Sequence, residues 1–287
     1  MQLPPLWICG NSSVQLFDPN APFDAAKPAW NWDSKTAAGI PDERREWFLE
    51  LDEVKPVLLA GEPCILVTAS WRGGCALIRR SDGAVLFTLN LANAHSAELL
   101  PDGWIAIAGS GGSDKLVIQH VSAGVQASGA RAEFPLPSGH GAVFEPQRSL
   151  LWVSGASRVE LYHWVATSGQ FVCERVREIT LPDFGAHDMQ PHPAGERMLV
   201  TTANDVWDID ASTYELGPFK PLAGQKDVKG VSIEAGSGAI AYVQGEKERW
   251  WSEDIHLLFR DGSPQRLTLP GRYLYKARWD QSCWLNR

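Results

Sequence analysis

The chain has 287 residues, of which 44% are hydrophobic and 13 are tryptophans, and its formal net charge is −8 with a pI near 5.4. This much apolar and aromatic sequence excludes an intrinsically disordered chain. The acidic balance argues against nucleic acid or an anionic membrane surface as a partner. No apolar run approaches the roughly 18 residues of a membrane span, so we expect no insertion into a membrane.

The N-terminal segment predicts two strands without a preceding partner. Residues Trp7–Phe17 align with Trp152–Tyr162, which are the second and third strands of a later repeat. An insertion at about 33–52 follows, in which charged residues surround an apolar trio after Pro41. Proline at the start of such a segment is typical of a short helix.

A strand–turn–strand pattern then recurs along the chain. Complete copies span Lys55–Leu91, His95 to about Leu136, His140–Leu181, His187–Leu222 and Lys229–Leu269, and a sixth begins at Tyr275. Six key positions mark the start of the first strand of each copy: Lys55, His95, His140, His187, Lys229 and Lys276. Their spacings of 40, 45, 47, 42 and 47 residues are typical of four-stranded β-propeller blades.

We therefore predict an all-β fold, a six-bladed β-propeller that forms a single domain over residues 1–287. Tyr275–Trp279 would supply the first strand of the last blade and Trp7–Trp32 the remaining strands, which closes the ring and removes its open edges. Cys283–Leu285 could instead compete with Trp7–Cys9 for the second-strand position.

The cysteines and the N-terminus bear on the compartment. The five cysteines contain no CxxC pair and most lie in apolar strand patterns, so buried reduced thiols are expected. Residues Met1–Pro5 lack the positively charged and apolar regions of a signal peptide, which predicts a cytoplasmic location. A sequence beginning at the mature protein would look the same, so export remains open.

The key positions suggest a polar site. The first strand of each blade lines the central channel, so these positions should form a ring at one channel mouth, surrounded by the loops that contain Trp71 and Arg72 and by Trp250 and Trp251. Three lysines in a confined space repel one another unless an anion compensates. One hypothesis is a pocket for a carboxylate or phosphate with tryptophans that stack on a sugar ring. The alternative is a polar plug balanced by Glu53, Glu98, Asp188 and Asp227.

A sharper hypothesis concerns the three histidines. His95, His140 and His187 lie on consecutive blades and could converge on one divalent metal ion, such as zinc or manganese, with a position left open for a substrate. Other enzyme signatures are absent: the chain contains no GxSxG elbow, no GxGxxG after a strand, no P-loop and no HExxH. No catalytic residue can be assigned from the sequence, and whether the protein is an enzyme stays open.

Several phrases resemble a bacterial β-propeller family of unknown function. They are Asn93–Gly103, Pro137–Gly141, Tyr273–Trp279, Asp52–Pro56 and Asp227–Val231. The resemblance covers nearly the whole chain, implies the propeller fold and supports the repeat register, but it implies no activity. Members of this family are often exported, so the resemblance implies export as the alternative to the predicted cytoplasmic location. A looser, architectural similarity is to oligogalacturonate-lyase-type propellers, in which histidines and a glutamine hold a divalent metal at the channel mouth.

The sequence thus predicts a protein that binds a small anionic molecule, and an acidic saccharide in particular, at a mouth lined by His and Lys. The predicted ligand-binding residues are Lys55, His95, His140, His187, Lys229, Lys276, Trp71 and Arg72. A metal-dependent lyase or hydrolase that acts on an acidic sugar, with metal at His95, His140 and His187, is the first alternative. A protein-interaction scaffold is the second, and the oligomeric state is not specified.

Overall fold

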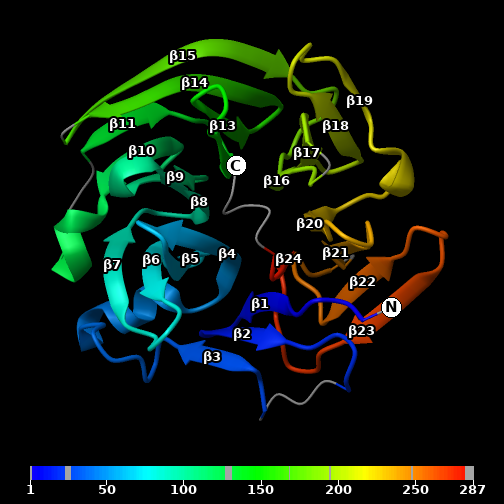
Figure 1. Ribbon diagram of the computed structural model, residues 1–287, viewed down its shortest axis with the longest axis horizontal. Coiled ribbons are helices and arrows are strands. Elements are labelled where there is room, and N and C mark those ends of the chain that lie inside the picture. The colour runs from blue at the N-terminus through cyan, green and yellow to red at the C-terminus, as the bar shows by residue number, and fades with distance from the viewer. Residues whose placement is uncertain are drawn as a thin grey trace.

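The computed structural model describes residues 2–22, 27–126, 131–167, 169–193, 195–246 and 248–281. Within these ranges, 24 strands form six four-stranded antiparallel sheets around a central axis (Figure 1). The predicted six-bladed β-propeller is therefore confirmed. In each sheet the strands follow chain order from the axis outward, except that the last sheet combines the two ends of the chain.

The blades are numbered from the first sheet that is continuous in sequence. Blade 1 contains β4 (Leu51–Leu59), β5 (Glu62–Ala69), β6 (Gly74–Arg79) and β7 (Val85–Asn90). Blade 2 contains β8 (Ala94–Leu100), β9 (Trp104–Gly109), β10 (Lys115–His120) and β11 (Ala132–Pro135). Blade 3 contains β12 (Gly139–Glu145), β13 (Leu150–Gly155), β14 (Arg158–Thr167) and β15 (Gln170–Thr180).

The remaining blades complete the circle. Blade 4 contains β16 (Asp188–Pro191), β17 (Arg197–Thr201), β18 (Val206–Asp210) and β19 (Leu216–Pro218). Blade 5 contains β20 (Val228–Ile233), β21 (Ile240–Gln244), β22 (Asp254–Leu258) and β23 (Pro264–Thr268). Blade 6 contains β24 (Ala277–Trp279), β1 (Leu6–Gly10), β2 (Ser13–Phe17) and β3 (Trp30–Asp33).

The two ends of the chain close the ring as predicted. Strand β1 pairs antiparallel with β24, with Leu6 opposite Trp279 and Ile8 opposite Ala277. Strand β1 therefore occupies the second position of blade 6, for which Cys283–Leu285 was the alternative; that segment lies outside the described residues. Pairing with β24 covers the edge of β1 that would otherwise be open to another chain.

Apolar side chains fill the seams between neighbouring blades. Each of six buried clusters joins two adjacent blades, and tryptophans contribute to most of them. At the seam between blades 2 and 3, for example, the rings of Trp104 and Trp164 meet edge to face with centroids 6.0 Å apart. Because both faces of each sheet are covered, the second strand of a blade is largely apolar, as in β9.

The helical content is small. The short helix predicted after Pro41 is the 3-10 helix η1 (Asp42–Phe48), and its Phe48 is fully buried in the seam between blades 6 and 1. Three further 3-10 segments are η2 (Pro101–Gly103), η3 (Val121–Gln126) and η4 (Lys220–Leu222). No helix in the described ranges is long and apolar enough to cross a membrane. The described cysteines are free thiols: Cys9, Cys64, Cys75 and Cys173.

Candidate functional site

A β-bulge recurs at the start of the innermost strand. In blades 1, 2, 3 and 5 the pairing register skips one residue, and the skipped residues are Asp52, His95, His140 and Lys229. A bulge bends the strand and redirects a side chain. In five blades the residue two positions earlier has a positive φ: Glu50, Asn93, Ser138, Gly185 and Asp227. The same backbone turn therefore delivers one side chain per blade to the channel mouth.

This geometry corrects the predicted ring at two positions. In blade 1 the bulge residue is Asp52, three residues before Lys55. In blade 6 the equivalent residue is Tyr275, because Ala277, two residues later, begins the pairing with β1. In blade 4 the amide of His187 donates to Thr201 O, directly before Asp188 pairs with the same residue. We call the resulting set the mouth ring: Asp52, His95, His140, His187, Lys229 and Tyr275.

The residues immediately after the mouth ring point into the channel. They include Glu53, Asp188 and Lys276, which are at most 1% exposed. Lys276 Nζ lies 2.9 Å from Glu53 Oε2 and also donates to the carbonyl oxygens of His95 and His140, at 3.0 and 3.3 Å. Gly230 occupies the same level, where a Cβ atom would stand 3.1 Å from Lys276 Cα. Glycine thus provides the space in which the Lys276 side chain lies.

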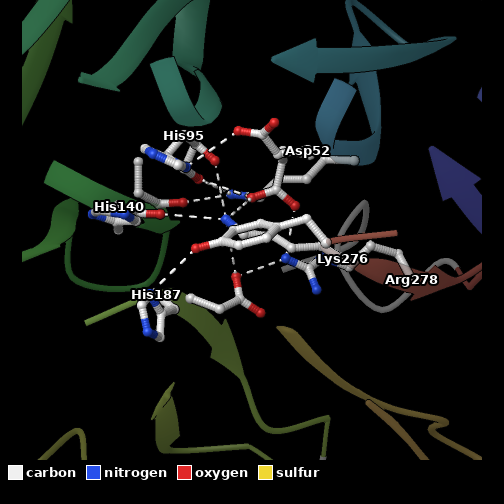
Figure 2. Close-up of polar contacts among 12 residues, drawn as sticks. Asp52, His95, His140, His187, Lys276 and Arg278 are labelled. Carbon is white, nitrogen blue, oxygen red and sulfur yellow. Dashed lines mark hydrogen bonds and ion pairs between the residues drawn. The ribbon is translucent and has the colours of Figure 1, made fainter. Parts of the chain in front are cut away.

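Arg278, two residues further along β24, completes the network (Figure 2). Its Nη2 lies 2.7 Å from both Glu53 Oε1 and Asp188 Oδ1. Burial acts to raise the pKa of Glu53, but Arg278, Lys276 and Lys55 outweigh it and lower this pKa to about 2. Two cations and two carboxylates therefore balance each other in the channel. These four side chains form a polar plug in part of the channel. A plug of this kind was the alternative to an anion pocket in the sequence analysis.

Lys55 extends the plug away from the mouth. Its Nζ lies 3.1 Å from Glu98 Oε2 and 2.6 Å from Ala142 O. Lys55 and Glu98 line a separate cavity of about 210 Å³ together with Phe144. The structure therefore places both Lys55 and Lys276 in an ion-paired channel plug, defined as Glu53, Lys55, Glu98, Asp188, Lys276 and Arg278, and not in a ring at the mouth as predicted. The cause is the register: these side chains follow the bulge.

The mouth itself is hollowed by a cavity of about 580 Å³. Its lining brings together several predicted site residues from distant blades: His95, His187, Lys229, Trp71 and Arg72. Its other lining residues are Ser70, Asn90, Ala92, Asn93, Gly111, Trp250 and Tyr275. Trp71 and Trp250 are 65% and 42% exposed, whereas Trp251 stacks on Tyr273 with centroids 4.1 Å apart. His140 belongs to the mouth ring but is not among the lining residues.

The three histidines do converge, as predicted (Figure 2). The rings of His95 and His140 stack with centroids 3.9 Å apart, and the ring of His140 meets that of His187 edge to face at 5.7 Å. Burial and the nearby lysine charges lower the pKa of His95 to about 3 and that of His187 to about 2. Burial, followed by the neighbouring His95, also lowers the pKa of His140. All three imidazoles are therefore neutral near pH 7.

The geometry does not align these histidines as metal ligands. Within the described ranges, no group of three or more His, Cys, Asp or Glu side chains is arranged to hold a metal ion. His140 Nδ1 bonds to Ser138 O at 2.9 Å, and both ring nitrogens of His187 have protein partners. The three-histidine metal site stays a prediction, for which metal analysis of the purified protein is the test.

A hydrogen-bonded chain crosses one wall of the cavity. Lys229 Nζ lies 3.0 Å from His187 Nε2, and His187 Nδ1 lies 3.2 Å from the hydroxyl of Tyr275. The ion pair between Lys229 and Asp227 is longer, at 3.5 Å. Burial lowers the pKa of Lys229, while the carboxylate of Asp227 acts in the opposite direction. Lys229 is thus less completely compensated than Lys55 or Lys276.

Asp52 anchors the opposite wall. Its carboxyl group accepts hydrogen bonds from the amide and hydroxyl of Ser70 at 3.1–3.2 Å, and its Oδ2 lies 3.2 Å from His95 Nδ1. Burial raises the pKa of Asp52 to about 8, although the hydrogen bonds from Ser70 lower it. Burial therefore favours the protonated form of Asp52, whose carboxyl group lies beside the neutral ring of His95.

Comparison with known proteins identifies the family and leaves its function open. Residues 22–283 match the family of unknown function DUF6528. The chain belongs to this family. No curated protein matches it. The resemblance to a β-propeller family of unknown function is thereby confirmed, and the looser similarity to oligogalacturonate-lyase-type propellers stays a prediction.

Solved structures support the fold alone. The chain is 13% identical to a protein of unknown function from Bacteroides caccae, with 97% of this chain and 100% of that chain covered and a TM-score of 0.60. A chain of a nidogen/laminin complex gives 9% identity, 97% and 98% coverage and a TM-score of 0.60. The chain covers 64% of a chain of Kuenenia stuttgartiensis hydrazine synthase, at 12% identity and a TM-score of 0.49 over 73% of its own length. At these identities, function does not transfer.

Sequence reasoning missed Asp52 and Tyr275 in this family member. Both follow the pattern of the other blades: an apolar or small residue precedes the mouth-ring position, and a buried apolar residue follows two places later. Leu51-Asp52-Glu53-Val54 and Leu274-Tyr275-Lys276-Ala277 match Ala94-His95-Ser96-Ala97 in this respect. An alignment of the blades on the apolar residues at these flanking positions, and not on shared Lys or His, would have placed Asp52 and Tyr275 in the ring.

Proposed function

We propose that this protein binds an acidic saccharide at the mouth cavity, with Lys229 neutralising the carboxylate of the sugar. The observation that carries this proposal is the contrast among the channel lysines. Lys276 has a carboxylate at 2.9 Å and Lys55 one at 3.1 Å, whereas the carboxylate of Asp227 stands 3.5 Å from Lys229 and is exposed. A carboxylate that enters the cavity would give Lys229 a closer partner.

Size and shape also support a small ligand. The cavity volume of about 580 Å³ falls within the range of about 300–1,000 Å³ typical of small-molecule sites. Trp71 and Trp250 offer exposed indole rings at its edge. Apolar faces of this kind pack against the C–H face of a pyranose ring, while the polar edge stays hydrated. The guanidinium of Arg72 lies at the same rim and adds positive charge.

Two asparagines supply acceptors for sugar hydroxyl groups. The side-chain N–H of Asn90 donates to Arg72 O at 2.7 Å, and that of Asn93 donates to Gly111 O at 3.2 Å. These bonds use the donor side of each amide, so the amide oxygens are left to accept from a ligand. An acidic saccharide has both of the matching groups, a carboxylate and several hydroxyls.

Calorimetry with matched sugars tests the proposal. The binding of D-galacturonate to the protein is compared with that of D-galactose, and the binding of D-glucuronate with that of D-glucose. Each neutral sugar differs from its uronate only at the carboxylate carbon. We expect binding of at least one uronate and an affinity about 10-fold weaker for its neutral partner, because an ion pair with a partly desolvated lysine contributes roughly that factor. Equal affinities, or no binding of any of these sugars, would overturn the proposal.

Variants and a chelator locate the site and its chemistry. Lys229→Met should abolish the preference for the uronate. Lys220→Met, at an exposed lysine in η4, should leave that preference unchanged.

A chelator tests whether binding needs a metal ion. We expect uronate binding to survive EDTA, because the proposed contacts need no metal ion. Loss of uronate binding in EDTA, with recovery on adding zinc or manganese, would favour the metal-dependent alternative instead.

A further inference from the structure

The hydrogen-bonded chain on the cavity wall has a direction that follows from its chemistry. Lys229 Nζ lies 3.0 Å from His187 Nε2 and 3.5 Å from Asp227 Oδ1. Burial lowers the pKa of Lys229, and the ion pair with Asp227 opposes this and favours the ammonium form. An ammonium group has donors and no acceptor. Nε2 of His187 must therefore accept this bond, so it carries no proton.

The tautomer of His187 then fixes which atom donates in its hydrogen bond with Tyr275. A neutral imidazole that accepts at Nε2 holds its proton on Nδ1. His187 Nδ1 lies 3.2 Å from the hydroxyl oxygen of Tyr275, and accordingly donates to it. The proton of the Tyr275 hydroxyl cannot point back to His187 and must be donated elsewhere.

The mouth cavity, which Tyr275 lines, can receive this proton. Tyr275 is 3% exposed, and its ring centroid lies 5.6 Å from that of Trp250, 5.7 Å from that of His95 and 6.4 Å from that of His187. Among the described residues, the hydroxyl forms a hydrogen bond with His187 alone. Below it, Lys276 Nζ lies 5.9 Å from the ring centroid, so the phenol forms the cavity floor above the channel plug.

We propose that Tyr275 is a specificity-determining residue that donates a hydrogen bond to the carboxylate of the ligand, in a direction set by Lys229 and His187. This inference rests on the proposed function. It narrows the ligand to one whose anionic group presents only acceptors to the cavity floor, which a uronate carboxylate does. A primary amide in the same place would offer an acceptor to one of Lys229 and Tyr275 and turn its NH2 donors toward the other, and an ammonium group would turn donors toward both.

Tyr275→Phe tests the donor directly. The ligands are the uronate that binds the wild type and its primary amide, and calorimetry measures both. The wild type should prefer the carboxylate, and the variant should lose about 10-fold of that preference, because one hydrogen bond to a charged group is removed. Tyr273→Phe, at an exposed tyrosine outside the cavity lining, is the matched control and should keep it. An unchanged preference in Tyr275→Phe would overturn the inference.

The tautomer of His187 gives a second, independent readout. Nitrogen-15 NMR of the ring distinguishes a protonated Nδ1 from a protonated Nε2 in the folded protein, without any ligand. We expect Nδ1–H, and an Nε2–H tautomer or an imidazolium would overturn the inference. Uronate binding by the wild type combined with an unaffected Tyr275→Phe would reject this inference alone. Absence of uronate binding would reject the proposed function as well.

Discussion

The mouth and the plug occupy the same channel, and each plug residue follows a mouth-ring residue by one or three positions along the chain, yet the two layers differ in how their charges are paired. In the plug, Lys276 and Arg278 share Glu53 and Asp188 at distances of 2.7–3.5 Å, with all four side chains at most 1% exposed. At the mouth, three histidines are neutral and Lys229 has a distant, exposed carboxylate partner. Full ion pairing characterises the structural layer, and incomplete pairing beside a cavity characterises the layer for which we propose a ligand.

Backbone geometry sharpens the same contrast. Five blades place a residue with positive φ two positions before the mouth ring, and four of these residues are not glycine. Such conformations each cost about 1 kcal/mol or more and persist where surrounding structure enforces them. The plug residues follow these positions along the chain, and none of them has a positive φ. In this part of the channel the strained backbone therefore lies directly before the mouth ring and not in the plug.

The largest effect is expected in the plug. Glu53→Gln removes one negative charge shared by Lys276 and Arg278, and leaves these two buried cations to share the carboxylate of Asp188. We expect a loss of about 3–5 kcal/mol in the free energy of unfolding, measured by urea denaturation. Glu43→Gln, an exposed residue of η1, should change it by less than about 0.5 kcal/mol. A plug variant as stable as that control would show that these charges are not coupled to folding.

An intermediate effect is expected from the pH dependence of the mouth. The pKa of His187 falls from 6.5 to about 2 on folding, so below about pH 6.5 the unfolded state binds a proton that the folded state does not. Stability is therefore lost as the pH falls from 6.5 toward 2. His187→Asn should reduce the slope of unfolding free energy against pH by about 1 kcal/mol per pH unit between pH 6 and 5.

Denaturation curves at pH 5, 6 and 7 supply that slope. His163→Asn, at an exposed position of β14, serves as the matched control and should follow the wild type. If both variants give the wild-type slope, His187 is not held neutral by burial in the folded protein.

The smallest effect on stability is expected at Lys229. Because its ammonium is buried and weakly paired, Lys229→Met replaces an incompletely compensated charge with an apolar side chain of similar length. We expect the free energy of unfolding to stay within about 1 kcal/mol of the wild type, or to rise. A loss comparable to that of Glu53→Gln would place Lys229 in the structural layer and remove the contrast on which the proposed site depends.

The sequence by itself determined the repeat, the six blades and the shared closing blade, because apolar strands and turns recur at a period that a propeller requires. It also brought His95, His140, His187 and Lys229 to one end of the channel. Apolar periodicity does not reveal a bulge, so Lys55 and Lys276 were aligned with these residues when they belong one or more positions further along their strands.

Only the tertiary structure decided which charges meet. Glu53 and Lys276 are 223 residues apart, and their contact arises because the first and last blades are neighbours around the axis. The same closure places Tyr275 against His187, 88 residues away in the chain. Pairings of this kind depend on ring geometry and on side-chain direction after a bulge, and neither is encoded in the local pattern of any one strand.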